Sequence, residues 1–401
     1  MNDYLKRTWA EINLNHIAGN VKAIQACLRP GCQMMGVVKA DAYGHGDKYA
    51  ADCLRRQGVT WFGVSNLEEA LSLRRQGFTE NILIFGITPA SHAGTLACHS
   101  ITQSVFSLEY AEKLSAAAAA LGVEVPVHIK LDTGMGRIGF STFEGPEQAA
   151  ACAGKVYGLS GLKPSGIFTH FAVADESSEE SRQYTLTQFK RFEETCGELE
   201  RKGFPCGLRH CCNSAAMLGY PEMHLDMVRP GNIIYGLYPS IDCLRERKIN
   251  LNPAMELKSM VSMVKEMDGG RSVSYGRTYE TQGRRIIATV PIGYADGYTR
   301  RLSNKARVLI HGQYAPQVGN VCMDQMMVDV TDIAQTSPVR EGDIVTLFGR
   351  QGGREIPVEE LAELTGTINY EIVCVLGRRV PRIYIENGEK IAVVDYIRNT
   401  L

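Results

Sequence analysis

The sequence lacks an excess of charge of either sign. Its 401 residues include 43 basic and 44 acidic ones, which leaves a formal net charge of −1. A basic surface is typical of proteins that bind nucleic acid or an anionic membrane, so neither partner is indicated. No apolar run is long enough to span a bilayer, and residues 1–7 lack the apolar core of a signal peptide. We therefore expect a cytoplasmic protein.

Paired cysteine motifs are also missing. The chain has 12 cysteines but no CxxC spacing, so we interpret them mostly as small buried apolar residues and not as a disulfide or zinc framework. There is no internal repeat with a period of about 20 to 50 residues, which argues against a repeat protein. At about 150 residues per domain, the length predicts two or three domains.

Short apolar runs of strand length recur in the first part of the chain. A strand at 9–14 and a helix ending near Leu28 come first, and helical patterns such as 67–76, 108–121 and 180–202 separate most of the later runs. Eight such strands alternating with helices predict a (β/α)8 barrel, with a doubly wound open sheet as the alternative. The eight runs are 34–38, 61–65, 81–86, 101–106, 125–131, 165–170, 208–212 and 225–229.

The pattern changes from about Asn252 onward, where β-rich runs are broken by Gly and Asp and little helix is indicated. We expect a barrel domain over 1–248, whose first few residues are free to pair with the second domain, and a mainly β domain over 249–401. Polar clusters with tyrosine or cysteine at 274–276, 293–297 and 320–325 suggest a shared site. The β-rich runs are 260–267, 285–292, 306–310, 325–330, 343–348 and 380–385.

Lys39 stands at the end of the first barrel strand. A lysine held against an apolar wall loses hydration, so its free amine becomes available to form a Schiff base with a carbonyl compound. Taken alone, Lys39 is better interpreted as a lysine that reaches solvent. However, Tyr43, His45 and three glycines lie within a few residues of Lys39, at the mouth of a helix that can begin near Asp47, and such a helix start can bind phosphate.

Further polar residues lie at or just after the C-terminal ends of the predicted strands. In a barrel these ends lie on one face, where active sites are found, and the last two strands commonly build a phosphate site. A reactive lysine beside a phosphate site indicates pyridoxal phosphate. The residues are Lys130, Asp132, Arg137, His170, His210, Asn213, Ser214, Arg229, Gly231 and Asn232.

Arg229 bears most directly on the type of reaction. If it faces the ring of the cofactor, its guanidinium can hydrogen-bond the pyridine nitrogen without giving up a proton. The ring is then a weak electron sink, which favours proton exchange at the α carbon over transamination. Taken alone, Arg229 is better interpreted as part of a salt bridge at the barrel rim.

Eight motifs together resemble those of the alanine racemases, which are pyridoxal-phosphate enzymes with an N-terminal barrel and a C-terminal β domain. The resemblance runs essentially from end to end. The motifs are VVKADAYGHG at 37–46, DTGMGR at 132–137, NSA at 213–215, RPG at 229–231, VSYG at 273–276, IGYADG at 292–297, CMD at 322–324 and INYE at 368–371.

The resemblance implies a role for each site residue. Lys39 holds the cofactor and acts as one base, and Tyr275 from the partner subunit of a head-to-tail homodimer acts as the other. Arg137 contacts the ring phenolate and the substrate carboxylate, steadied by Lys130, which is carbamylated in some relatives. The implied cofactor contacts are completed by Tyr43, His170, His210, Asn213, Ser214, Gly231, Asn232 and Tyr370, and the substrate and entrance contacts by Met323, Asp324, Tyr294 and Arg300.

The implied activity is the interconversion of L- and D-alanine, which supplies D-alanine for bacterial peptidoglycan. Tyr370 favours alanine over serine, because relatives that prefer serine carry a smaller polar residue there. Asn320 and Asn232 depart from the family, which often has arginine and an aliphatic residue at these positions. The alternatives are a serine or broader racemase, a decarboxylase of the same fold, which would use an acidic partner in place of Arg229, and a non-enzymatic cofactor carrier built as a lone barrel.

Overall fold

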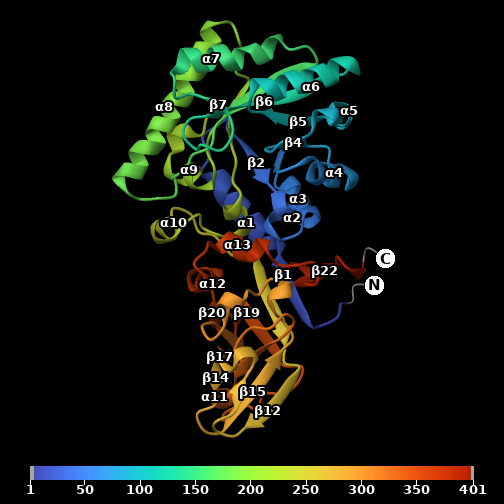
Figure 1. Ribbon diagram of the computed structural model, residues 1–401, viewed down its shortest axis with the longest axis vertical. Helices are drawn as coiled ribbons and strands as arrows, with labels where there is room; N and C mark the ends of the chain where they lie inside the picture. Colours follow the sequence, from blue (N-terminus) through green and yellow to red (C-terminus); the bar gives the residue numbers. More distant parts are fainter. Residues whose placement is uncertain (1–3, 399–401) are drawn as a thin grey trace. The chain divides into compact units, whose positions relative to one another are not determined.

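A computed structural model describes residues 4–398, which divide into two units. The barrel unit comprises 17–42 and 47–252, and the β unit comprises 4–16, 43–46 and 253–398. Figure 1 shows each unit and labels many of its helices and strands. Within 4–398, no helix is long and apolar enough to cross a membrane.

The barrel unit is built on eight parallel strands in the order β10-β2-β3-β4-β5-β6-β8-β9. The ring closes between β9 and β10, where Asp226 N donates to Arg209 O at 3.1 Å and Arg229 N donates to Cys212 O at 3.0 Å. The predicted (β/α)8 barrel is therefore confirmed. The strands are β2 (Gln33–Val37), β3 (Trp61–Val64), β4 (Asn81–Ile84), β5 (Ile101–Val105), β6 (Val125–Asp132), β8 (Leu162–Phe168), β9 (Leu208–His210) and β10 (Met227–Val228), and the short β7 (Phe140–Ser141) pairs with β6.

Helices α4 to α8 are arranged around these strands (Figure 1). Several begin where a side chain accepts a backbone N–H, as Asn66, Ser107 and Ser178 do at the starts of α4, α6 and α8. The helices are α1 (Leu14–Ala26), α2 (Lys39–Tyr43), α3 (Asp47–Arg56), α4 (Leu67–Arg75), α5 (Ala93–Cys98), α6 (Leu108–Ala120), α7 (Pro146–Gly154), α8 (Glu179–Arg201), α9 (Ser214–Gly219) and α10 (Ile241–Glu246).

The β unit contains a sheet in the order β12-β15-β18-β17-β16-β19-β11-β1-β21-β22. Strand β1 pairs antiparallel with β11 and parallel with β21, so the start of the chain is part of this sheet. The strands are β1 (Thr8–Asn13), β11 (Met255–Met260), β12 (Met263–Met267), β15 (Arg285–Val290), β16 (Arg307–Ile310), β17 (Gln313–Val318), β18 (Met326–Asp329), β19 (Ile344–Gln351), β20 (Arg354–Ile356), β21 (Arg382–Glu386) and β22 (Glu389–Val394), with β13 (Ser272–Val273) and β14 (Tyr279–Glu280) apart from it.

Three details of the β unit differ from expectation. The run predicted at 260–267 belongs to two strands, because β11 ends at Met260 and β12 begins at Met263. Strands β17 and β22 were not predicted; β17 contains a proline, and β22 begins with two charged residues. The unit also contains the helices α11 (Thr331–Ala334), α12 (Val358–Thr365) and α13 (Asn369–Cys374).

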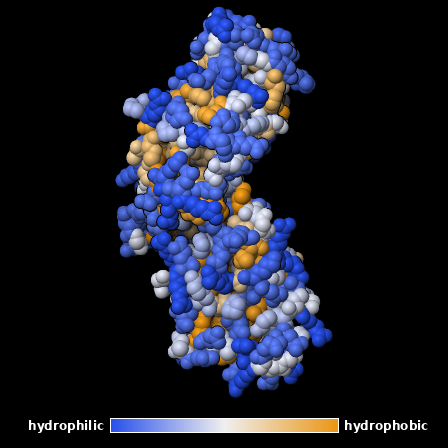
Figure 2. Space-filling view, turned by 90° about the vertical axis from the view of Figure 1, so that its left-hand side faces the viewer, coloured by the Kyte–Doolittle hydropathy of each residue, from blue (hydrophilic) through white to orange (hydrophobic). Residues whose placement is uncertain are grey.

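The barrel core contains side chains from neighbouring strands, including a buried cluster of Met35, Trp61, Leu83 and Met227. On the face shown in Figure 2, hydrophilic residues dominate and apolar ones form small separate groups. Burial of the apolar runs therefore explains why these segments form strands, and the ends of the strands position the polar residues.

Candidate active site

Lys39 follows the end of β2 and begins a turn of unusual hand. Ala40, Asp41 and Ala42 have φ of 53°, 54° and 53° with ψ of 49°, 48° and 51°, which is the left-handed helical region. For residues other than glycine this region costs roughly 1–2 kcal/mol each. Backbone strain of this kind persists only where the surrounding structure enforces it.

Glu69 in α4 supplies part of that enforcement. Its Oε1 accepts from Ala40 N at 2.8 Å and its Oε2 accepts from Ser65 N at 2.7 Å. Asp41 Oδ1 accepts from Asp47 N at 2.8 Å, at the start of α3. Both oxygens of one carboxylate thus fix the backbone beside Lys39 and the loop after β3. No sequence pattern indicated this role for Glu69.

Arg229, just after β10, is buried with only 4% of its surface exposed. Its Nη1 lies 3.0 Å from His210 Nδ1, and its Nη2 donates to Thr169 O at 2.8 Å and Cys211 O at 3.0 Å. His170 Nδ1 is 3.4 Å from Nη2. Within 4–398, no carboxylate forms an ion pair with Arg229, so the alternative of a rim salt bridge is wrong.

His210 is itself held between Arg229 and a second histidine. Its Nε2 lies 2.9 Å from His128 Nδ1, and its ring stacks on Phe168 with centroids 4.8 Å apart. Burial and then the charge of Arg229 hold the pKa of His210 well below its ordinary range and lower the pKa of His128 to about 3. Burial lowers the pKa of Arg229 to about 10. Near neutral pH both imidazoles are therefore neutral while the guanidinium is charged.

Lys130 in β6 is 2% exposed, and its Nζ donates to Leu131 O at 2.6 Å. Burial, and then the charge of Arg229, lower its pKa to about 7. Arg137 lies exposed in the following loop, where Asp132 Oδ1 accepts from the backbone N–H groups of Gly134 and Gly136 at 3.1 and 3.0 Å. The implied contact between Lys130 and Arg137 stays a prediction.

The residues predicted to bind phosphate after β9 and β10 lie close together. Ser214 Oγ accepts from Gly231 N at 2.9 Å. Asn213 caps α9 by accepting from Ala216 N at 2.9 Å, and Asn232 Oδ1 accepts from Ile233 N at 3.1 Å. Ser214 and the backbone of Gly231 therefore form one local arrangement, whereas the side chain of Asn213 serves the helix.

The three polar clusters of the β unit lie together. Asn320 Nδ2 donates to Tyr275 O at 2.7 Å, and Ala295 N donates to Met323 O at 3.0 Å. Arg300 Nη1 also reaches this loop, donating to Val321 O at 3.1 Å, and Asp324 forms an ion pair with Arg379.

Several side chains of this group face solvent. Tyr275 is 69% exposed and Met323 50%, and Tyr294 is also exposed. Elsewhere in the β unit, Tyr43 and Tyr370 meet edge to face with centroids 6.4 Å apart.

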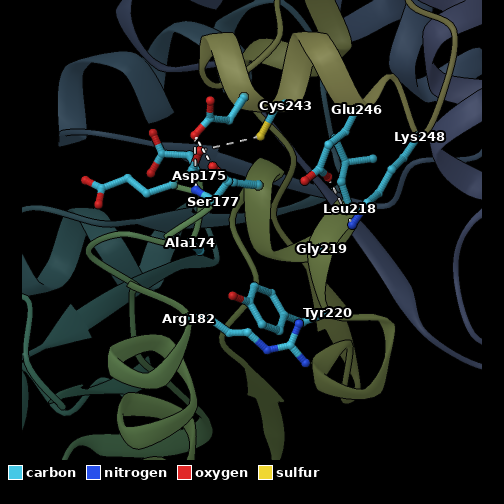
Figure 3. Close-up of a pocket in the computed structure, with 13 residues that line it drawn as sticks. Ala174, Asp175, Ser177, Arg182, Leu218, Gly219, Tyr220, Cys243, Glu246 and Lys248 are labelled. Carbon is cyan, nitrogen blue, oxygen red and sulfur yellow. Dashed lines mark hydrogen bonds and ion pairs between the residues drawn. The ribbon is translucent and has the colours of Figure 1, made fainter. Parts of the chain in front are cut away.

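A cavity of about 120 Å³ lies in the barrel unit beside α9 and α10 (Figure 3). Its lining includes Asp175, Ser177 and Cys243 in one part and Glu246 and Lys248 in another. None of the predicted site residues lines it. The residues with candidate chemistry are those at the strand ends.

The barrel has a lysine after its first strand and a buried, charged arginine after its last, and it is joined in sequence to a mainly β unit. These features define a class of two-domain barrel enzymes. The family models described as alanine racemase N-terminal domain and C-terminal domain match residues 12–239 and 254–384. The chain therefore belongs to the alanine racemase family.

Individual relatives agree with this. The chain is 48% identical to the alanine racemase of Desulfovibrio desulfuricans over 94% of its length and 98% of that protein. It is 44% identical to alanine racemase 1 of Clostridium acetobutylicum, covering 98% of this chain and 99% of the other. Among solved structures, the alanine racemase from Bacillus anthracis with bound L-Ala-P has a TM-score of 0.92 at 36% identity, covering 99% of this chain and 100% of that one.

Proposed function

We propose that this protein interconverts L- and D-alanine with pyridoxal phosphate as its cofactor, and that the D-alanine serves peptidoglycan synthesis. Membership of the alanine racemase family supports both the substrate and the cofactor. The observation that carries the proposal is the environment of Arg229, a charged guanidinium buried among neutral hydrogen-bond partners.

The residues of the barrel unit fit this cofactor. Lys39 supplies an amine at a strand end, and Ser214 with the Gly231 backbone supplies polar groups for a phosphate. Arg229 uses Nη1 and Nη2 in the hydrogen bonds given above, whereas its Nε–H takes part in none among residues 4–398. The Nε–H and one N–H of Nη1 are thus left, and either can donate to the ring nitrogen. When bound, the cofactor supplies an electron sink for the bond that is broken at the α carbon.

Racemisation requires a proton acceptor on each face of the α carbon. We assign Lys39 Nζ to one face and the hydroxyl of the partner subunit's Tyr275 to the other. For one enantiomer Lys39 removes the proton and the tyrosine returns one, and for the other the roles reverse. The high exposure of Tyr275 supports its use across the interface of a homodimer.

Arg229 determines which reaction is favoured. Because a guanidinium donates a hydrogen bond without surrendering its proton, Arg229 would leave the ring nitrogen of a bound cofactor unprotonated, and the cofactor would then supply only a weak electron sink. The decarboxylases of related fold use an acidic partner at this position. The neutral surroundings of Arg229 among the described residues therefore favour the racemase.

We assign substrate recognition to Arg137, Met323 and Asp324, with Tyr294 lining the entrance. Arg137 suits a carboxylate, because its exposed guanidinium lies on the loop that Asp132 holds at the end of β6. Tyr370, packed against Tyr43, favours alanine over serine.

Chiral chromatography tests the proposal. The purified protein is incubated with cofactor and each L-amino acid in turn, and the enantiomers are separated. We expect L-alanine to reach an equal mixture of enantiomers, and L-serine to react much more slowly. Release of CO2 and an amine, or equal rates with alanine and serine, would contradict the assignment.

A further inference from the structure

The hydrogen bonds that lead away from Arg229 have a fixed direction. A guanidinium only donates, so His210 Nδ1, 3.0 Å from Nη1, must accept. A neutral His210 then carries its proton on Nε2, which lies 2.9 Å from His128 Nδ1. His128 must therefore accept through Nδ1, and when neutral it carries its own proton on Nε2.

The opposite direction is excluded by the same chemistry. If His128 donated from Nδ1, His210 would accept at Nε2 and, when neutral, would present an N–H to the N–H of Arg229. A doubly protonated His210 would place a second positive charge beside the guanidinium. Burial and that guanidinium hold the pKa of His210 well below its ordinary range, which disfavours this form.

The far end of the chain makes no hydrogen bond. His128 Nε2 is buried and has no partner among residues 4–398. The ring is instead held by packing: Trp61 lies 5.4 Å away between centroids, and a Cβ added at Gly166 in β8 would come within 2.6 Å of Nε2. A buried donor without an acceptor is unfavourable, and an apolar residue would avoid that cost. The gain from a histidine here therefore lies at its other nitrogen.

We propose that His128 is a positioning residue, whose Nδ1 holds the His210 ring so that the His210 Nδ1 lone pair faces Arg229. This inference rests on the proposed placement of Arg229 against the cofactor ring. Without His128, the buried Nε2–H of His210 loses its acceptor. The ring can then turn or change tautomer, and Arg229 loses the neutral acceptor that orients its guanidinium.

A matched pair of variants separates this role from packing. Leucine and asparagine have the same branching and number of heavy atoms, and both remove the ring that contacts Trp61, but only asparagine offers an oxygen close to the position of Nδ1. We expect His128→Leu to lower kcat about tenfold, and His128→Asn to lower it by less than about threefold. Equal loss in both variants would overturn the proposal, because packing alone would then explain it.

Ring 15N–1H NMR of histidine-labelled protein with bound cofactor gives a readout independent of turnover. The His210 resonances are assigned by comparison with His210→Asn. We expect one neutral tautomer with the proton on Nε2 in the wild type and in His128→Asn, and a shifted or second population in His128→Leu. A proton on Nδ1 in the wild type, or an unchanged spectrum in His128→Leu, would overturn the proposal.

The two measurements also distinguish this inference from the proposed function. An altered His210 spectrum with unchanged kcat would refute the claim that His128 serves the reaction. If the wild type did not racemise alanine, the proposed function would fail whatever the spectrum showed. Should His128→Leu not fold, Gly166→Ala displaces the same ring through the 2.6 Å approach and should alter the His210 spectrum in the same direction.

Discussion

Replacing Lys130 by methionine should change how stability depends on pH. The Lys130 ammonium is disfavoured by burial first and then by the charge of Arg229, with Arg137 acting in the same direction, so its pKa falls from 10.5 to about 7. If the lysine is charged in both the folded and the unfolded chain, this pKa difference costs about 5 kcal/mol of folding free energy. The side chain is 2% exposed, so water screens this cost little.

The sign follows from counting protons. Between the folded pKa of about 7 and the unfolded value of 10.5, the unfolded chain holds a proton that the folded chain does not. The free energy of unfolding therefore rises with pH across this window, and below it the full cost is present. For this one group we expect a rise of about 2.5 kcal/mol between about pH 6 and pH 9, which Lys130→Met should lack.

Urea unfolding followed by circular dichroism measures this, in buffers free of CO2 and at fixed protein concentration. The free energy of unfolding of Lys130→Met should exceed that of the wild type by the largest amount near pH 6. The lost hydrogen bond to Leu131 adds only an offset that is the same at every pH. Lys163→Met serves as the control, because the Lys163 side chain is 67% exposed and should leave the pH dependence unchanged. Parallel curves for Lys130→Met and the wild type would refute the reasoning.

The same neutral amine is the form that reacts with CO2, giving a carbamate and releasing a proton. The new negative charge would be attracted by the guanidinium groups of Arg229 and Arg137, which act on this site. We therefore expect added bicarbonate to stabilise the wild type and not Lys130→Met, with a carbamate resonance in 13C NMR after 13C-bicarbonate labelling. No such resonance would show that Lys130 is not carbamylated.

Four further experiments test the site. Borohydride should fix the cofactor to the peptide that contains Lys39, and mass spectrometry that finds it on Lys130 instead would refute the assignment. Mixing inactive Lys39→Ala chains with inactive Tyr275→Phe chains should restore activity in hybrid dimers with one intact site; no activity despite proven hybrids would place both bases in one chain. Arg229→Glu should slow racemisation and raise the share of pyruvate formed by transamination, so unchanged racemisation without pyruvate would contradict the role of Arg229. The amide of Glu69→Gln has one oxygen and can accept from only one of the two backbone N–H groups, those of Ala40 and Ser65. We expect cofactor binding, measured by fluorescence titration, to weaken by about 1–3 kcal/mol. Unchanged affinity would show that the carboxylate does not shape the Lys39 turn.

The pattern of apolar runs was enough to predict the barrel. Its parallel strands are buried on both faces, so they stand out as continuous apolar runs, as in Trp61–Val64 and Ile101–Val105. Because all the strands run the same way, the polar residues that follow them had to meet at one end. Element boundaries were less certain: β8 begins at Leu162, before the predicted position, because Pro164 and Ser165 interrupt its apolar pattern.

How the site residues are held depends on contacts between distant parts of the chain. Alanine favours the right-handed helix, so nothing in Ala40–Asp41–Ala42 predicts a left-handed turn, which depends on a carboxylate 29 residues further along the chain. The sequence pattern likewise did not single out His128, whose partner His210 is 82 residues away. Apolar periodicity reflects burial over a few neighbouring residues, whereas a hydrogen-bond direction or a shifted pKa arises only when distant strands close into a ring and exclude water from the groups between them.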